Sequence, residues 1–125
     1  MILGLGIDSV EISRFKRWHA YSKNKLLRFF SATEVDYCLK EPHKAAERFA
    51  ARFSTKEALL KALSQAYPEK QFNLLHIAKN CQVLSLHGKP QLEINFAALN
   101  ISKIQALVSL THTRQTASAA VIIHI

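Results

Sequence analysis

Segment 42–66 constrains the fold more than any other part of the sequence. It begins with Pro42, which suits the first turn of a helix, is rich in Ala, Lys, Glu and Leu, and ends shortly before Pro68. Apolar side chains recur along it at helical spacing: Ala46, Phe49, Ala50, Phe53, Leu60 and Leu63. This spacing predicts one long amphipathic helix whose apolar stripe must be covered by the rest of the chain.

Shorter elements are predicted before this helix. Residues 2–7 form a short apolar run, which indicates a buried strand ended by Asp8. Residues 11–20 have the spacing of an amphipathic helix. Ser31-Ala-Thr-Glu34 has the form of a capping box, which predicts a second short helix through about Leu39.

The second half of the chain has the character of an antiparallel sheet. Four runs are β-prone or alternate between apolar and other residues: 81–87, 91–96, 104–111 and 117–125. Gly88-Lys89-Pro90 and the polar link 112–116 are typical of hairpin turns. We therefore predict an α+β fold, in one domain spanning residues 1–125, with an N-terminal strand, helices including one long central helix, and C-terminal antiparallel strands.

The charge balance narrows the class of partner. The 125 residues include 17 Lys and Arg against 9 Asp and Glu, a formal net charge of +8, which favours an anionic partner such as nucleic acid, a phosphorylated cofactor, an acidic protein or a membrane surface. The 2 cysteines lie far apart and in no paired motif, so neither a disulfide scaffold nor a cysteine-rich zinc site is expected. We expect a cytoplasmic protein, because no signal peptide or membrane-spanning run is evident.

Two acidic residues stand at unusual places. Glu57 lies within or beside the apolar stripe, where a carboxylate is costly to desolvate unless it is paired or binds a metal. Lys61, four residues on, offers a simple ion-pair partner. Asp8 can cap the helix that follows it, or it can meet Glu57 if strand 2–7 packs on the long helix. Two carboxylates converging on a basic groove would suit Mg²⁺ together with waters and substrate phosphates.

Cations also form a pattern on the long helix. Lys44, Arg48, Arg52 and Lys56 are spaced by four, which predicts one basic ridge. The ridge fits either a polyanion or an ordinary solvated surface. His112 and Thr113 follow the predicted strand 104–111 and can touch a phosphate, although an ordinary hairpin histidine fits the pattern as well.

Five segments, in this order along the chain, together resemble one family. They are Gly6-Ile-Asp8-Ser-Val-Glu11-Ile-Ser-Arg14, Phe30-Ser-Ala-Thr-Glu34, Arg48-Phe-Ala-Ala-Arg52-Phe-Ser-Thr-Lys56-Glu57-Ala-Leu-Leu-Lys61-Ala, Gly88-Lys89-Pro90 and Val108-Ser-Leu-Thr-His112. The family is that of the holo-[acyl-carrier-protein] synthases, the small 4′-phosphopantetheinyl transferases of fatty-acid synthesis. The resemblance implies that family's fold and its reaction, in which the 4′-phosphopantetheine arm of coenzyme A moves to a serine of apo-acyl-carrier protein and adenosine 3′,5′-bisphosphate is released.

The resemblance also implies roles for individual residues. Asp8 and Glu57 match the Mg²⁺ ligands, and Lys61 matches a lysine near the transferring phosphate. The proton acceptor stays open between Glu57, Asp8 and a metal-bound water. The residues implied to bind coenzyme A are Arg48, Arg52, Lys56, Lys89, Pro90, His112 and Thr113, the last four from a neighbouring subunit of a homotrimer. Those implied to grip the acidic carrier protein are Arg14, Phe15, Trp18 and Arg28.

One departure and one alternative accompany this interpretation. Ser64-Gln65-Ala66 replaces the Gly-x-Gly step that usually follows the central helix in this family, which affects how the backbone can approach a phosphate. The alternative is a small basic nucleic-acid-binding domain, supported by the net charge and the ridge. The predicted strands argue against it, because they offer few aromatic side chains for base stacking.

Overall fold

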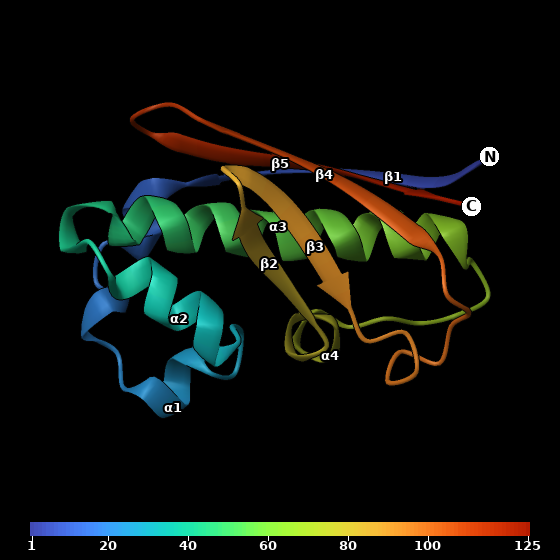
Figure 1. Ribbon diagram of the computed structural model, residues 1–125, viewed down its shortest axis with the longest axis horizontal. Helices are drawn as coiled ribbons and strands as arrows, with labels where there is room; N and C mark the ends of the chain where they lie inside the picture. Colours follow the sequence, from blue (N-terminus) through green and yellow to red (C-terminus); the bar gives the residue numbers. More distant parts are fainter.

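The computed structural model describes residues 1–125. The long helix α3 (Ala45–Ala66) forms the middle layer, preceded by a 3₁₀ turn over Pro42–Lys44 (Figure 1). A three-stranded sheet covers one side of α3, and the short helices lie on the other side (Figure 1). The predicted long helix and the α+β class are confirmed.

The three-stranded sheet is antiparallel in the order β1-β5-β4. Its strands are β1 (Ile2–Glu11), β5 (Thr116–His124) and β4 (Gln105–His112). The expected end of the first strand at Asp8 is wrong, because β1 continues to Glu11 and pairs with β5 along most of its length. Asp8 therefore sits within a strand, opposite Ala119.

Two glycines allow β1 to lie very close to α3. A Cβ at Gly6 would overlap the carbonyl oxygen of Ala58 and lie 2.8 Å from its carbonyl carbon. A Cβ at Gly4 would likewise overlap the carbonyl oxygen of Ala62. The strand can take this position only because these residues have no side chain.

The β2–β3 hairpin forms a separate two-stranded sheet. Strands β2 (Cys81–Leu86) and β3 (Lys89–Ile94) are joined by His87 and Gly88, whose φ angles are 51° and 74°. Positive φ at both central residues is the geometry of a tight hairpin turn that matches strand twist. The predicted hairpin is therefore confirmed, but its turn is His87-Gly88, and Lys89 and Pro90 already belong to β3.

The short helices are α1 (Lys23–Leu26), α2 (Ala32–Leu39) and α4 (Leu74–Lys79). The predicted capping box at the start of α2 is present, with Ser31 N donating to Glu34 Oε1 at 2.8 Å and Glu34 N donating to Ser31 Oγ at 3.1 Å. Segment 11–20 does not form the predicted helix but two short 3₁₀ turns, Ile12–Phe15 and Trp18–Ala20.

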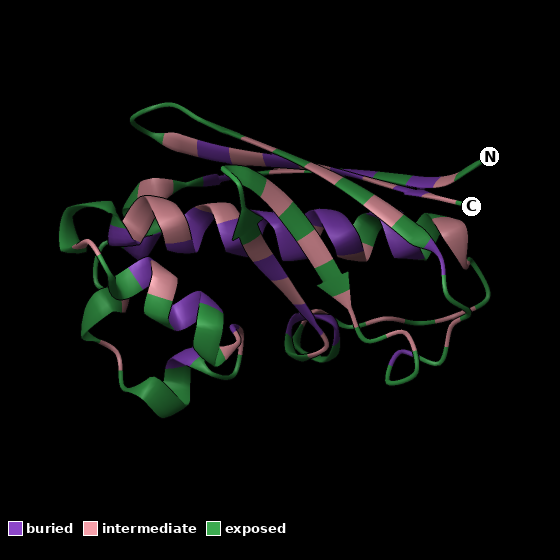
Figure 2. Cartoon of the chain, in the orientation of Figure 1, coloured by how far each residue is buried: buried purple, intermediate pink, exposed green.

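The core is divided along α3, which is buried over most of its length (Figure 2). One cluster is aromatic and packs on the first half of the helix; it includes Phe15, Phe30, Phe49 and Phe53. The other is mainly aliphatic and packs on the second half; it includes Leu59, Leu63, Ile77, Val121 and Ile123. No helix of the chain has both the length and the apolar character needed to cross a membrane.

Candidate functional site

Asp8 is held against α3 by two side chains of that helix. Ser54 Oγ donates to the backbone oxygen of Asp8 at 2.9 Å and to its Oδ2 at 3.2 Å. Lys61 Nζ lies 3.3 Å from Oδ1 of Asp8 and donates to the Ile7 carbonyl oxygen at 3.0 Å. Glu57 lies three residues after Ser54 and four before Lys61, which is the spacing of one helix face.

Glu57 is half-buried and belongs to none of the ion pairs of the chain. The simple helix salt bridge between Glu57 and Lys61 is therefore absent, because Lys61 pairs with Asp8 instead. No group of three or more His, Cys, Asp or Glu side chains lies together. Two carboxylates, one of them unpaired, nevertheless match what Mg²⁺ takes from a protein when waters and phosphates complete its shell.

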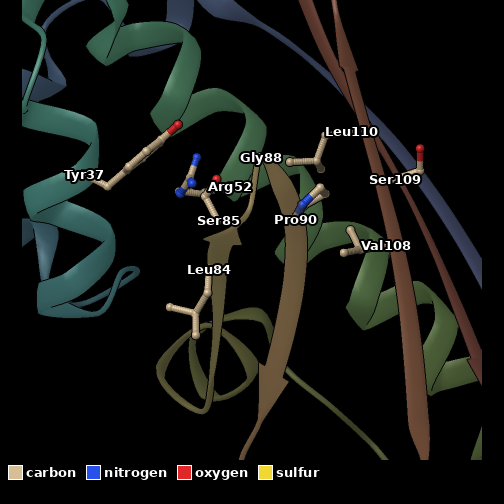
Figure 3. A pocket seen from close by; sticks show the side chains of 9 residues that line it. All are labelled: Tyr37, Arg52, Leu84, Ser85, Gly88, Pro90, Val108, Ser109 and Leu110. Carbon is tan, nitrogen blue, oxygen red and sulfur yellow. The ribbon is translucent and has the colours of Figure 1, made fainter.

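A groove lies on the other edge of the sheet, between α3 and β4. Its innermost cavity, of about 340 Å³, is lined by α2, α3, the β2–β3 hairpin and β4 (Figure 3). The lining residues are Tyr37, Arg52, Leu84, Ser85, Gly88, Pro90, Val108, Ser109 and Leu110. A second hollow of about 480 Å³ shares Tyr37, Arg52 and Leu110 and adds Arg48 and His112. A third, of about 460 Å³, shares His112 and adds Thr113.

Arg52 is the unusual cation of this groove. Its side chain is almost wholly buried, and its Nε has no hydrogen-bond partner. Figure 3 shows the guanidinium between Tyr37 and Ser85 at the edge of the cavity. A buried donor without a partner is costly, so this group favours an anionic ligand.

Arg48 is tied to the protein more fully than Arg52. Its Nη1 donates to the Tyr37 carbonyl oxygen at 3.0 Å, and its Nη2 lies 3.3 Å from Glu41 Oε1. Both guanidinium groups stack on the Tyr37 ring, 4.2 Å and 4.3 Å from its centroid. Lys44, together with Arg48, holds the pKa of the Glu41 carboxyl below its ordinary value.

Tyr37 was missed by the sequence analysis. It follows Glu34 by three residues on α2, and this helical spacing was its only local signal. His112, which the analysis did include, is paired with Glu47 through Nε2 and Oε1 at 2.5 Å. Lys89 is exposed at the start of β3, next to the cavity residue Pro90.

Lys56 requires a correction. Lys56 does not belong to the predicted basic ridge, because it is buried and its Nζ donates to Glu34 and to three backbone carbonyl oxygens. An ammonium group has three hydrogens, so no donor is left for a ligand. The expectation that Lys56 contacts coenzyme A is therefore wrong.

The four residues expected to bind the carrier protein differ in exposure. Phe15 is fully buried and packs on Trp18 and Phe53, with ring centroids 4.5 Å and 5.4 Å away, so the expectation that it contacts a partner is wrong. Trp18 is half-buried in the same aromatic cluster. Arg14 and Arg28 are exposed, and the Arg14 guanidinium lies over the Phe15 and Phe53 rings.

The Ser64-Gln65-Ala66 segment remains helical, as the last turn of α3. Gln65 Oε1 accepts a hydrogen bond from Leu5 N at 2.7 Å. Gln65, the middle residue of this segment, therefore fastens β1 to the end of α3, one turn beyond Lys61.

The chain is similar to known proteins along nearly its whole length. The model of the 4′-phosphopantetheinyl transferase superfamily matches residues 4–120. The chain belongs to this superfamily. The holo-[acyl-carrier-protein] synthase of Treponema denticola is 39% identical over 127 residues, with 98% of both chains covered. That of Treponema pallidum is 40% identical over 129 residues, with 98% of this chain and 96% of the relative covered.

Solved structures of the superfamily have the same fold. An acyl carrier protein synthase of Mycobacterium tuberculosis is 27% identical, with a TM-score of 0.74 and coverage of 99% and 98%. One from Chronobacterium ammoniagenes, solved as a complex with coenzyme A, is 25% identical, with a TM-score of 0.80 and coverage of 97% and 96%. The superfamily fold therefore extends over nearly all of this chain.

Proposed function

We propose that the chain transfers the 4′-phosphopantetheine arm of coenzyme A to a serine of apo-acyl-carrier protein, giving holo-acyl-carrier protein and adenosine 3′,5′-bisphosphate, in a Mg²⁺-dependent reaction of fatty-acid synthesis. Its membership of the superfamily supports the reaction class. The names of its relatives support the carrier protein as acceptor, and the coenzyme A complex of the Chronobacterium ammoniagenes relative supports the donor.

The observation that carries the proposal is the groove between α3 and β4. Residues from distant parts of the sequence, among them Arg48, Arg52, Pro90 and His112, line hollows that share walls. Coenzyme A bears a diphosphate and a 3′-phosphate, which require cationic and hydrogen-bonding groups. Arg52, which lines both hollows, supplies a guanidinium of the required kind.

Asp8 and Glu57 are the residues that would hold Mg²⁺, and Lys61 stands beside Asp8. The chemistry that Mg²⁺ supplies when bound is neutralisation of the diphosphate charge and polarisation of the reacting phosphorus. Ser54 fixes Asp8 through its carboxylate and its backbone oxygen, so this carboxylate is oriented before any ligand arrives. Lys61 adds a positive charge that can stabilise the phosphate as negative charge develops on it.

The transfer itself needs positioning more than covalent chemistry. The serine oxygen of the carrier protein forms a bond to the phosphorus that bears the pantetheine arm. The bond from that phosphorus to the bridging oxygen of the diphosphate breaks, and adenosine 3′,5′-bisphosphate leaves with the electron pair. The serine proton passes to a base, for which Glu57 and Asp8 are the candidate side chains of the chain.

We further propose that the active enzyme is a homotrimer with active sites between subunits. Within one chain, Asp8 lies on the β1 edge of the sheet, whereas the groove lies along β4 on the opposite edge. The outer face of the sheet also carries an apolar row, in which Leu5 is paired with Ile122 and Ile122 with Leu107. Leu5 and Leu107 are exposed, and such a row favours cover by another copy.

The exposed cations Arg14 and Arg28 belong to segment 12–30, which contains no acidic residue. We propose this segment as the surface that meets the acidic carrier protein, because complementary charge steers association. Phe15 and Trp18 support this surface from the core, because Phe15 packs on Trp18 and its ring lies beneath the Arg14 guanidinium.

Mass spectrometry tests the proposal directly. Apo-acyl-carrier protein is incubated with the chain, coenzyme A and Mg²⁺, and a second sample contains a chelator. A gain of one phosphopantetheine per carrier, absent with chelator, is the expected result. No gain with several apo-carrier proteins, together with salt-dependent oligonucleotide binding, would replace the proposal with the nucleic-acid-binding alternative.

A further inference from the structure

A buried ion pair joins the elements that form the innermost cavity of the groove. Glu34 and Lys56 have side chains that are 0% and 1% exposed, and Lys56 Nζ lies 2.7 Å from Glu34 Oε1. The same Oε1 accepts from Ser31 N at 2.8 Å, and Oε2 accepts from Val83 N at 2.9 Å. Both oxygens of the carboxylate are therefore satisfied inside the protein.

Lys56 extends this network to further segments. Its Nζ donates to the carbonyl oxygen of Phe29 at 2.6 Å, that of Ala78 at 3.0 Å and that of Cys81 at 3.2 Å. The pair thus fastens the segment before α2, helix α2, helix α4 and strand β2 to the central helix α3. Each bond is directional, so the set is satisfied in one arrangement of these elements.

Three residues that line the 340 Å³ cavity lie close in the sequence to residues of this network. Each is within one helical turn, or one residue along a strand, of Glu34, Lys56 or Val83. Tyr37 follows Glu34 by three residues on α2, and Arg52 precedes Lys56 by four residues on α3. Leu84 directly follows Val83 on β2 and lines the cavity (Figure 3). A shift of the pair would therefore move all three walls relative to one another.

We propose that Glu34 and Lys56 are positioning residues for nucleotide binding: they touch no ligand, but they fix the spacing between the walls that Tyr37, Arg52 and Leu84 provide. The inference rests on the proposed function, because it assigns the cavity to coenzyme A. Buried charge pairs are often no more stabilising than apolar residues of similar size, so their main effect here is geometric. Walls that are fixed before binding avoid the entropic cost of ordering them around the ligand.

Glu34→Asp tests this role while keeping the charge. The shorter carboxylate cannot reach Lys56 Nζ and Val83 N together, so the bond that ties β2 to α2 is lost while the pair stays neutral overall. We expect the KM for coenzyme A to rise about tenfold, equivalent to ~1.4 kcal/mol, and the KM for the carrier protein to stay within about twofold. An unchanged KM for coenzyme A, or an equal rise in both constants, would overturn the proposal.

Two further variants separate positioning from loss of stability. Ile123→Ala removes a buried side chain from the other core cluster and is expected to destabilise the fold without changing the KM for coenzyme A. If it raises that KM as much as Glu34→Asp does, the proposal is wrong. The double variant Glu34→Gln with Lys56→Met removes both charges, and its KM for coenzyme A should stay raised. A wild-type KM in this variant would overturn the proposal, because packing alone would then fix the spacing of the cavity walls.

Hydrogen exchange in the wild-type chain keeps the test decisive even if the variants fail to fold. Without ligand, the Val83 amide should exchange as slowly as core amides of α3, and exchange at the rate of the exposed hairpin turn would contradict the proposal. A wild-type chain that transfers no phosphopantetheine would refute the proposed function instead. A working wild-type enzyme with an unaffected Glu34→Asp variant would refute only this inference.

Discussion

The close approach of β1 to α3 makes Gly6→Ala the most informative single substitution. The added Cβ would overlap the carbonyl oxygen of Ala58 and lie 2.8 Å from its carbon and 2.9 Å from Ala62 N. All of these are backbone atoms of a buried helix, so no side chain can rotate to make room. Strand β1 must therefore move away from α3, and this movement also weakens the packing of the residues next to Gly6 on α3.

The expected penalty follows from this geometry. Overpacking of a core by one carbon costs roughly 1–3 kcal/mol, and an obstacle made of backbone belongs at the upper end of that range. We therefore expect Gly6→Ala to lower the free energy of unfolding by about 3 kcal/mol. Because Asp8 is two residues along the same strand, its bonds with Ser54 and Lys61 should be strained as well, and turnover should fall.

Urea unfolding at fixed protein concentration measures the effect. Gly88→Ala is the matched control, because a Cβ there meets nothing within 4 Å and only the φ of 74° is unfavourable. The control should lose about 1 kcal/mol, as expected for a non-glycine residue in the left-handed region. If Gly6→Ala is as stable as wild type, or no less stable than the control, the close-packing argument is refuted.

Four further predictions concern charge and burial. Glu57→Gln should nearly abolish phosphopantetheine transfer and leave the urea midpoint unchanged. The control Glu69→Gln, on an exposed loop, should change neither the transfer nor the midpoint. Normal transfer by Glu57→Gln would refute the metal-ligand assignment. Arg14→Glu should raise the KM for the carrier protein about tenfold at low salt and leave that for coenzyme A unchanged, and an equal effect on both would show that the carrier surface is misplaced. Burial raises the pKa of the Cys38 and Cys81 thiols to about 12, so at pH 8 both should resist thiol reagents until the chain unfolds. Since thiols of the unfolded chain ionise near pH 9, the free energy of unfolding should fall as the pH rises from 9 toward 12, and a flat profile would contradict this.

Local patterns were sufficient for the elements whose cause is local. The helix α3, the capping box of α2 and the turn at Gly88 all follow from neighbouring residues, and the structure confirms them. Strand β1 shows the limit of such patterns. Its inward positions are Gly4, Gly6 and Asp8, while the apolar Leu5 and Ile7 point away from α3 and are exposed.

The short apolar run predicts a buried strand, but the face of β1 that packs on α3 is the one with the small residues. Glycine at the helix contact becomes understandable only when the carbonyl of Ala58 is known to lie there. The same kind of non-local information decides the end of the strand. Asp8 continues it because β5 offers pairing partners as far as Thr116, more than 100 residues away in the sequence.

The two lysines that flank Glu57 show why the candidate site could be predicted only in part. Only Lys61 has a carboxylate at helical spacing, because Glu57 lies four residues before it, whereas Glu57 directly follows Lys56. Spacing alone therefore favours a pair between Glu57 and Lys61. The structure pairs Lys56 with Glu34 and Lys61 with Asp8, each on a different element, and neither bonds Glu57. Tertiary packing thus uses both cations elsewhere and leaves one half-buried carboxylate without a counter-charge. A half-buried carboxylate without a counter-charge favours a cation from outside the chain, which is the physical reason for proposing Mg²⁺ at Glu57 rather than at Glu34.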